Sequence, residues 1–260
     1  MTTLSQPLQA ARTKVPAVTA LFWVIKVLTT GMGETASDFL AHTVAPPVAV
    51  GLGALGFGAA MTLQFAARRY VTWIYWLAVV MVSVFGTMAA DVLHVGLGVP
   101  YAVSTVAFAV ALAVVFVAWH RSEGTLSIHH VDSRRRELFY WAAVLATFAL
   151  GTAAGDLTAT VLGWGYLGSG VVFAVAIAVP ALAYRRGLLG PVAAFWTAYV
   201  ITRPLGASFA DWMGVSHARG GLAWGTGPVT AAWAIVIVAL VAYLGVTRAD
   251  VEPTRPRRTA

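Results

Sequence analysis

The sequence contains no cysteine and few charged residues, and each shortage excludes a class of protein. Without cysteine the chain has no disulfide, no thiolate metal site and no cysteine nucleophile. Only 10% of the 260 residues are charged, whereas a soluble domain carries about 25%. Hydrophobic residues make up 59%. This composition indicates an integral membrane protein and leaves no domain for binding nucleic acid, despite the net charge of +7.

Long apolar runs follow one another through the chain, and each is long enough to cross about 30 Å of hydrocarbon as a helix. The runs lack the two-residue alternation of membrane β-strands. We therefore predict an all-α membrane protein with a single domain over 1–260 and no signal peptide. The eight predicted transmembrane helices span 16–40, 46–67, 71–93, 98–119, 138–160, 164–184, 190–213 and 223–246.

Basic residues are concentrated in alternate loops. They lie in the tails 1–14 and 247–260, in the loop 120–137, and in the short loops after the second and sixth predicted helices. The loops on the other side hold only Arg219. The positive-inside rule therefore predicts that both termini are cytoplasmic. The same basic clusters are also suited to anionic lipid head groups.

Four tandem two-helix repeats make up the chain, over about 16–67, 71–119, 138–184 and 190–246. In the first helix of each repeat, an aromatic residue precedes a tryptophan, a glycine follows ten residues later, and an aspartate five residues after that. The tryptophans are Trp23, Trp76, Trp141 and Trp196; the glycines are Gly33, Gly86, Gly151 and Gly206; the aspartates are Asp38, Asp91, Asp156 and Asp211. Repeats of two helices all share one orientation, so we predict parallel helical hairpins in a pseudo-four-fold ring, with two pairs of pairs as the alternative.

With this W-x9-G-x4-D pattern, the sequence from about 15 to 246 resembles an uncharacterised bacterial family of integral membrane proteins. That family is built from four tandem two-helix repeats of unknown function, each with a characteristic tryptophan. The resemblance implies a location in the bacterial inner membrane, and it implies no activity or catalytic residue. The tryptophans themselves are predicted to anchor the helices at the cytoplasmic interface, with an aromatic constriction of a pore as the alternative.

Acidic residues inside the predicted helices are the main functional signal, because an ionised carboxylate at membrane depth costs several kcal/mol. The predicted cation pathway consists of Glu34, Asp38, Asp91, Asp156 and Asp211. Glu34, Asp38 and His42 follow one another at four-residue spacing, which puts them on one helix face, and His94 comes three residues after Asp91. The predicted ligands of a divalent metal (Mn, Zn, Fe or Co) are Glu34, Asp38, His42, Asp91 and His94.

Two basic residues inside the predicted helices break the repeat symmetry. Lys26 stands where other repeats have valine or tyrosine, and Arg203 stands where they have threonine, serine or phenylalanine. We predict that they balance charge or gate the pathway. Arg203 is eight residues from Asp211, about 12 Å along a helix, so its partner is expected in another repeat. Pro204 is expected to kink its helix.

These observations favour a membrane transporter or channel for a cation, with a divalent metal as the preferred substrate. The alternative is a non-transport structural or sensory subunit, in which the aspartates form a packing latch by accepting backbone or tryptophan N–H groups of the next repeat. An intramembrane enzyme is disfavoured because no Ser–His or two-His-one-carboxylate spacing is present. The expected partners are membrane lipid and the transported cation, with a homo-oligomer left open. No cofactor is predicted apart from a divalent metal ion as substrate.

Overall fold

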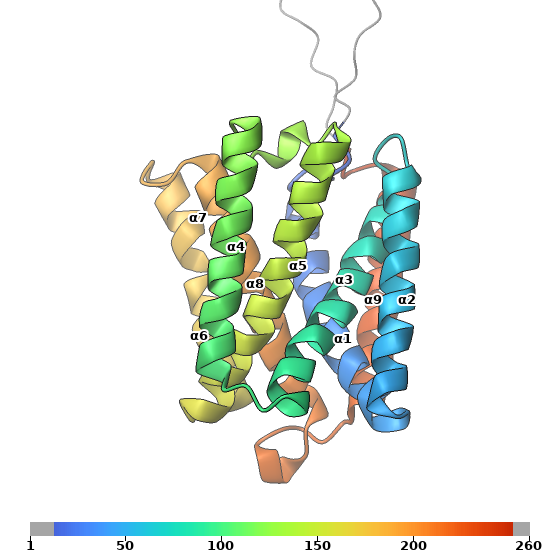
Figure 1. The fold of residues 1–260 in the computed structure, drawn as a ribbon, viewed down its shortest axis with the longest axis vertical. Coiled ribbons are helices and arrows are strands. Elements are labelled where there is room, and N and C mark those ends of the chain that lie inside the picture. The colour runs from blue at the N-terminus through green and yellow to red at the C-terminus, as the bar shows by residue number, and fades with distance from the viewer. Residues whose placement is uncertain (1–12, 252–260) are drawn as a thin grey trace, which may run out of the picture.

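A computed structural model describes residues 13–251, and within this range every regular element is a helix. The helices are α1 (Ala20–Thr43), α2 (Pro46–Ala66), α3 (Thr72–Asp91), α4 (Tyr101–Glu123), α5 (Arg134–Asp156), α6 (Gly165–Ala176), α7 (Ala178–Arg185), α8 (Pro191–Gly214) and α9 (Thr226–Thr247). The π-helical turns η1 (Val92–Gly96) and η3 (Leu157–Val161) extend α3 and α5, and the 3-10 turns η2 (Ile128–His130) and η4 (His217–Arg219) lie in loops. Figure 1 shows the long helices side by side in one bundle.

Seven of the predicted spans each correspond to one helix, and the span 164–184 corresponds to α6 and α7 together. Six segments are long and apolar enough to cross a membrane: α2, α3 with η1, α4, α5 with η3, α6 with α7, and α9. The predicted loop 120–137 is shorter than expected, because α4 continues to Glu123 and α5 begins at Arg134. The predicted helix 164–184 is divided at Ile177. Pro180 explains this break, because its ring excludes a regular hydrogen bond to the carbonyl of Ala176, where α6 ends.

Local capping residues explain where several helices begin and end. The side-chain oxygens of Thr19 and Ser133 accept hydrogen bonds from the first turns of α1 and α5, both at 3.3 Å. Proline occupies the first turn of α2 and of α8. Gly124 ends α4 in the left-handed conformation with φ of 71°. These caps set the hairpin boundaries close to the predicted ones.

Four helices form an inner layer and the others cover it. Helices α1, α3, α5 and α8, the first helices of the four repeats, each pack against two of the others and so close a ring. Outside this ring α2 packs mainly on α3, α4 on α5, α6 on α8, and α9 on α1. The second helix of each hairpin thus covers the first helix of the next repeat, and the last repeat covers the first.

The repeat glycines allow the inner helices to approach one another closely. A Cβ atom added at Gly33 would lie 1.9 Å from Ser83 Oγ, at Gly86 2.9 Å from Phe148 Cβ, at Gly151 2.3 Å from Arg203 Cγ, and at Gly206 1.9 Å from Thr30 Oγ1. Each glycine therefore faces the same position of the next repeat, and the fourth faces the first. This cyclic pattern is what a closed ring requires, and small residues at helix crossings are how membrane helices usually achieve it.

Replacing one of these glycines is expected to destabilise the ring. Gly206→Ala should lower the free energy of unfolding by about 1–3 kcal/mol, because the methyl group would also lie 2.6 Å from the carbonyl oxygen of Val27. Gly58→Ala is the control, since this exposed helical glycine has open space around it. This variant should raise the free energy of unfolding by about 0.5–1 kcal/mol. Thermal unfolding in detergent measures both, and equal shifts for the two variants would contradict the packing argument.

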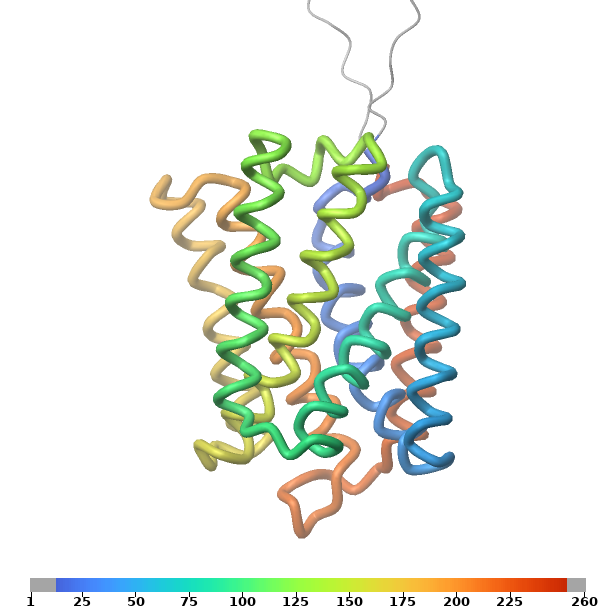
Figure 2. Tube along the Cα trace, viewed as in Figure 1, coloured from blue at the N-terminus to red at the C-terminus, as the bar shows by residue number. Residues whose placement is uncertain are grey.

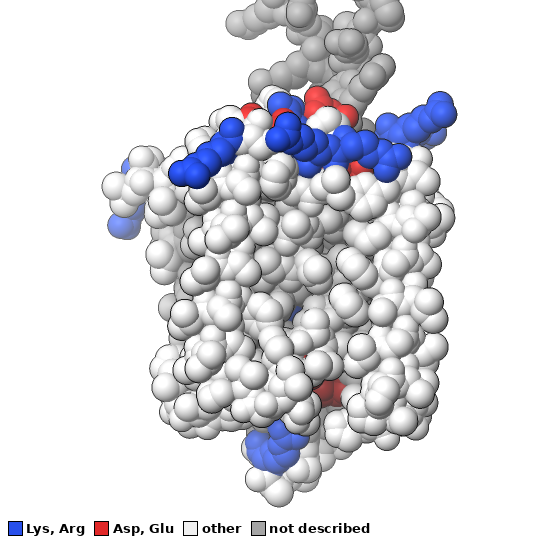
Figure 3. Space-filling view, viewed as in Figure 1, with Lys and Arg blue, Asp and Glu red and all other residues white. Residues whose placement is uncertain are grey.

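Charged side chains are concentrated at the ends of the bundle. Figure 3 shows lysine and arginine gathered at one end, which we call the basic end, above side walls almost free of charge. Both described ends of the chain lie there (Figure 2), and the backbone N–H of Ala17 donates to Asp250 O at 2.8 Å. Lys14 forms a buried ion pair with Glu137 at 2.6 Å. The remaining residues of the predicted cytoplasmic group, Arg12, Arg255, Arg257 and Arg258, lie outside the described residues.

Candidate functional site

Eight aromatic side chains form a layer of contacting rings around the inner helices near the basic end, six of them buried and two, Trp23 and Phe195, half-buried. The residue before each repeat tryptophan contacts the tryptophan of the next repeat, with ring centroids 5.7 Å apart for Phe22–Trp76, 5.7 Å for Tyr75–Trp141, 6.1 Å for Tyr140–Trp196 and 5.6 Å for Phe195–Trp23. We call these eight residues the aromatic layer. Trp76, Trp141 and Trp196 are buried between repeats, so the predicted role of interfacial anchor is wrong for these three. Trp23 is half-buried, and its predicted anchoring role stays a prediction.

Next to the aromatic layer lies Lys26, which is completely buried. Its Nζ has no hydrogen-bond partner and lies 4.1 Å from the ring centroid of Phe148 and 4.3 Å from that of Tyr199. Such contacts between a cation and a ring face partly offset the loss of hydration. The side chain therefore places a polar group on the ring axis that nothing in the described structure binds by a hydrogen bond.

Lys26→Met is expected to raise the free energy of unfolding by about 1–3 kcal/mol, the cost of a buried polar group without a hydrogen-bond partner. The equivalent position of the second repeat, Val79, supplies a matched control because it is equally buried. Val79→Met should destabilise by about 1–3 kcal/mol through overpacking. Thermal unfolding in detergent compares the two variants, and a less stable Lys26→Met protein would mean that the amine has a bound partner.

Arg203 links all four repeats on the axis. Its guanidinium group donates hydrogen bonds to Glu34 of the first repeat, Thr87 of the second and Thr152 of the third, the last at 2.7 Å. A further bond to the carbonyl oxygen of Thr30 is 3.3 Å long. Arg203 thus pairs with another repeat and not with Asp211. Glu34, Thr87 and Thr152 all stand four residues before a repeat aspartate, which is the sequence signal that relates them.

The acidic end of the ring, opposite the basic end, brings two of the repeat aspartates together with a histidine. Each of Asp91, His94 and Asp156 offers one ligand atom, and these three atoms lie within 4.8 Å of one another. We call this group the ligand cluster. It is the one group of three or more such residues in the described range with this geometry. On the face shown in Figure 3, acidic side chains are visible in a recess toward this end.

Two π-helical turns position the ligand cluster. Asp91 and Asp156 immediately precede η1 and η3, in which the N–H groups of Leu97 and Leu162 each donate to a carbonyl five residues earlier at 2.9 Å. In the first and fourth repeats, α1 and α8 continue as α-helices past the equivalent aspartates. Because π-helical turns are rare and often lie at functional sites, their presence only beside these two aspartates singles out the second and third repeats.

The hydrogen bonds of His94 determine which of its nitrogens is free for a ligand. His94 Nε2 and Ser104 Oγ form a hydrogen bond of 2.5 Å, and Ser104 Oγ also lies 3.0 Å from the backbone carbonyl oxygen of Tyr101. In the tautomer whose Nε2 donates to Ser104, Nδ1 of the neutral ring carries the lone pair. His94 is 8% exposed, and its buried Nδ1 has no hydrogen-bond partner. This is the arrangement of a metal-binding histidine, whose other nitrogen donates to an outer partner.

The other predicted ligands are not members of the ligand cluster, although the charges of Glu34 and Asp38 act on Asp91. Glu34 is bound to Arg203, and the exposed His42 uses Nδ1 to donate to the carbonyl of Asp38, its own helix neighbour, at 2.6 Å. Asp38 is half-buried and Asp211 is buried. The predicted set of five ligands is therefore divided, and Asp156, predicted only for the pathway, joins Asp91 and His94. Ser104 and the π-helical turns were not predicted.

The repeat aspartates lack donors from the protein. Within residues 13–251, no backbone or side-chain donor forms a hydrogen bond to the carboxylate of Asp38, Asp91, Asp156 or Asp211, although the backbone carbonyls of three of them accept bonds. Two carboxylates as close as those of Asp91 and Asp156 repel each other unless a proton or a cation lies between them. Either a proton or a cation between the two carboxylates would therefore relieve their repulsion.

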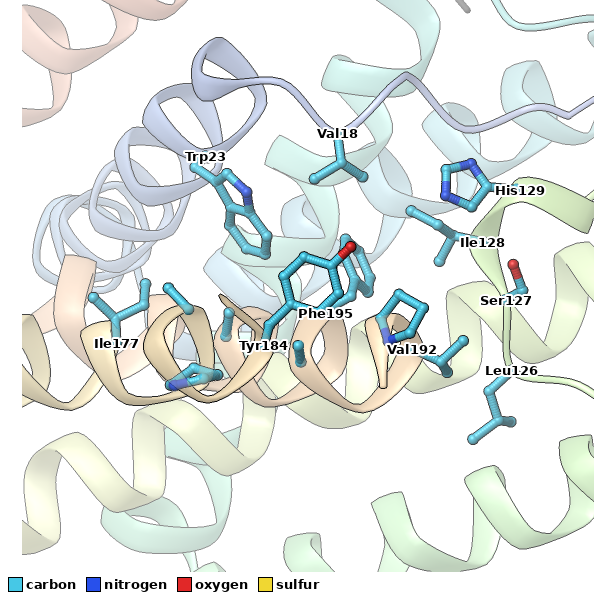
Figure 4. A pocket seen from close by; sticks show the side chains of 15 residues that line it. Val18, Trp23, Leu126, Ser127, Ile128, His129, Ile177, Tyr184, Val192 and Phe195 are labelled. Atoms are coloured by element: carbon cyan, nitrogen blue, oxygen red, sulfur yellow. The ribbon is translucent and has the colours of Figure 1, made fainter. Parts of the chain in front are cut away.

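A separate pocket of about 540 Å³ opens at the basic end, between α1, α7, α8 and the loop before α5. Its lining is mostly apolar, and Trp23, Tyr184 and Phe195 converge on its interior (Figure 4). No acidic residue lines it. The pocket therefore does not belong to the cation site.

The fold defines a class of protein: a helical bundle of tandem hairpins, six of whose segments are apolar and long enough to cross a membrane. The chain belongs to the family described as Repeat of Unknown Function (DUF347), whose model matches residues 21–70, 74–125, 139–187 and 194–250. The four matches coincide with the four predicted repeats. Comparison with curated proteins and with solved structures gave no match.

Proposed function

We propose that the protein spans a bacterial inner membrane eight times, with both termini in the cytoplasm. The six apolar segments support the membrane location. Helices α1 and α8 would be the two further spans, since their charged side chains Lys26, Glu34 and Arg203 are buried within the ring instead of facing lipid. The basic residues at one end support a cytoplasmic position for that end.

We further propose that the protein transports a divalent transition-metal cation and that the ligand cluster binds it. The observation that carries this proposal is the approach of two carboxylates, which accept no hydrogen bond from the described residues, to a ring nitrogen of the buried His94. Carboxylate oxygen with imidazole nitrogen suits Mn, Fe, Co or Zn. Two ionised carboxylates and a neutral imidazole would also balance the charge of a divalent ion.

The filled ring axis supports a carrier over an axial channel. The aromatic layer occupies the axis near the basic end, and Lys26 and Arg203 place two basic groups between it and the ligand cluster. A metal ion on the axis would have to displace both side chains and the packed aromatic rings. The cation would instead pass between the second and third repeats, whose η1 and η3 turns would rearrange. Metal ligands must be deprotonated, so transport would be coupled to proton exchange.

A structural or sensory subunit is the second candidate, and the Arg203 network favours it, because one side chain connects all four repeats. That network accounts for Glu34 but not for the aspartates. A latch made of aspartates needs donors, and the described residues offer none to these carboxylates. This difference supports transport as the role of the ligand cluster.

Metal flux into liposomes that contain the purified protein tests the proposal. Mn, Zn, Fe and Co are compared with Ca, Na and K, and a pH-sensitive dye records proton movement. Asp156→Asn should abolish the flux, whereas Asp38→Asn, the same change at the equivalent position of another repeat, should preserve most of it. No flux of any ion through the wild type, or equal loss in both variants, would overturn the proposed role of the ligand cluster.

A further inference from the structure

A groove runs between α3 and α9 and ends at the basic end of the bundle, whereas Asp91 of the ligand cluster lies at the opposite end of α3. Its volume is about 860 Å³, and apolar side chains of both helices, among them Trp76 and Val241, form its walls. Trp73, another lining residue, is 55% exposed. Arg69 and Arg248 also line the groove, and both are exposed. The groove thus combines an apolar wall with two positive charges.

The carboxylate of Asp250, two residues after Arg248, does not line the groove. Asp250 is 2% exposed. Its Oδ2 accepts hydrogen bonds from Tyr70 and, at 3.2 Å, from Thr72. Burial and the bond to Asp250 raise the pKa of Tyr70 above its ordinary value, so the phenol keeps its proton and remains a donor to that carboxylate. The lining contains no acidic residue, so the two arginines set the charge of the groove.

The dimensions of the groove match one leaflet of a bilayer. At 1.5 Å per residue, its wall on α9 rises about 21 Å from Ala234 to Arg248. One leaflet with its head groups is about 20–22 Å thick, half of the roughly 40–45 Å of a whole bilayer. A lipid along this wall would therefore reach from the middle of the membrane to its head group at the level of the two guanidinium groups.

We propose that this groove binds one phospholipid with an anionic head group. Its acyl chain would lie between α3 and α9, and Arg69 and Arg248 would bind the phosphate and the charged head group. Guanidinium groups suit this role because they bind phosphate oxygens with two parallel hydrogen bonds. The proposal rests on the membrane location proposed above but not on cation transport.

Native mass spectrometry of the protein released from detergent tests the proposal, with phosphatidylglycerol and phosphatidylcholine titrated separately. The wild type should retain one phosphatidylglycerol in preference to phosphatidylcholine. A basic residue near an anionic surface contributes about fivefold in affinity. The double variant Arg69→Gln/Arg248→Gln should therefore bind phosphatidylglycerol about 25-fold more weakly, and its affinity for phosphatidylcholine should change little. Arg68→Gln/Arg186→Gln removes the same charge from the same end without touching the groove and should behave like the wild type.

A second variant blocks the acyl chain and leaves both arginines in place. Gly245 lines the groove, and a side chain added there meets open space, so Gly245→Phe should fold and lose retention of both lipids. Gly58→Phe, at an exposed glycine of α2 with equally open surroundings, is its control. Three results would overturn the lipid site. The wild type could retain both lipids equally, or the two double arginine variants could lose affinity equally. The third is competition by inorganic phosphate together with no effect of Gly245→Phe. Asp156→Asn should retain the lipid normally, which separates failure of the cation proposal from failure of this one.

Discussion

Arg203→Met is expected to lower the free energy of unfolding by about 3–5 kcal/mol, as removal of one partner from a buried ion pair does. Arg203 is 0% exposed and Glu34 is 4% exposed, so the variant leaves a carboxylate in the interior without its counter-ion. It also removes the donor that connects Thr87 and Thr152 to the same centre. Because proteins are stable by only about 5–15 kcal/mol, thermal unfolding in detergent should show a large shift.

The double variant Arg203→Met/Glu34→Thr is the matched control for this loss. Threonine is the residue of the second and third repeats at the Glu34 position, so the double variant removes both charges and keeps a side chain that the ring already accommodates. Replacing a buried ion pair by uncharged groups is often neutral, so most of the lost stability should return. A single variant as stable as the wild type, or a double variant less stable than the single one, would contradict the view that Arg203 locks the repeats together.

Much of the fold could be predicted because the information for it is local and repeated. The length of each apolar run limits the helices, and the recurring tryptophan and glycine specify which face of each first helix meets its neighbour. The contact of Gly33 with Ser83 and that of Gly206 with Thr30 are the same contact in different repeats. The break at Ile177 was missed because 164–184 is one apolar run, although Pro180 within it carries the signal.

The candidate site could be predicted only in part, because it forms between helices. Four-residue spacing identifies residues on one face of one helix, which is why Glu34, Asp38 and His42 were grouped. In the structure Glu34 forms an ion pair with Arg203, and the His42 ring donates a hydrogen bond to the carbonyl oxygen of Asp38 in its own helix. The four aspartates are equivalent in the repeat, so the sequence does not specify that Asp91 and Asp156 meet. The π-helical turns that follow these two aspartates are likewise not predicted by any spacing in the sequence.

Asp156→Asn is expected to weaken binding of a divalent metal by more than about 100-fold, because it removes a direct ligand, and even outer partners of ligands contribute about 10–100-fold. Asp38→Asn is the control at the equivalent position and should change the affinity by well under tenfold. Isothermal titration with Zn or Mn, or the absorption of bound Co, measures the affinity in detergent without any need for transport. Affinity should also rise with pH, because the ligands bind the metal only after losing their protons.

Ser104→Ala distinguishes a metal site from a mere approach of acidic groups. Ser104 touches no carboxylate of the ligand cluster; it holds Nε2 of His94 at 2.5 Å and so leaves Nδ1 as the free nitrogen. If that nitrogen binds the metal, the variant should lose about 10–100-fold in affinity, while the two carboxylates remain unchanged. An affinity unaffected by Ser104→Ala and by His94→Gln, but reduced by every aspartate substitution alike, would mean that the acidic end attracts cations by its charge alone. A graded loss, largest for Asp156→Asn and intermediate for Ser104→Ala, requires a site of defined geometry between the second and third repeats.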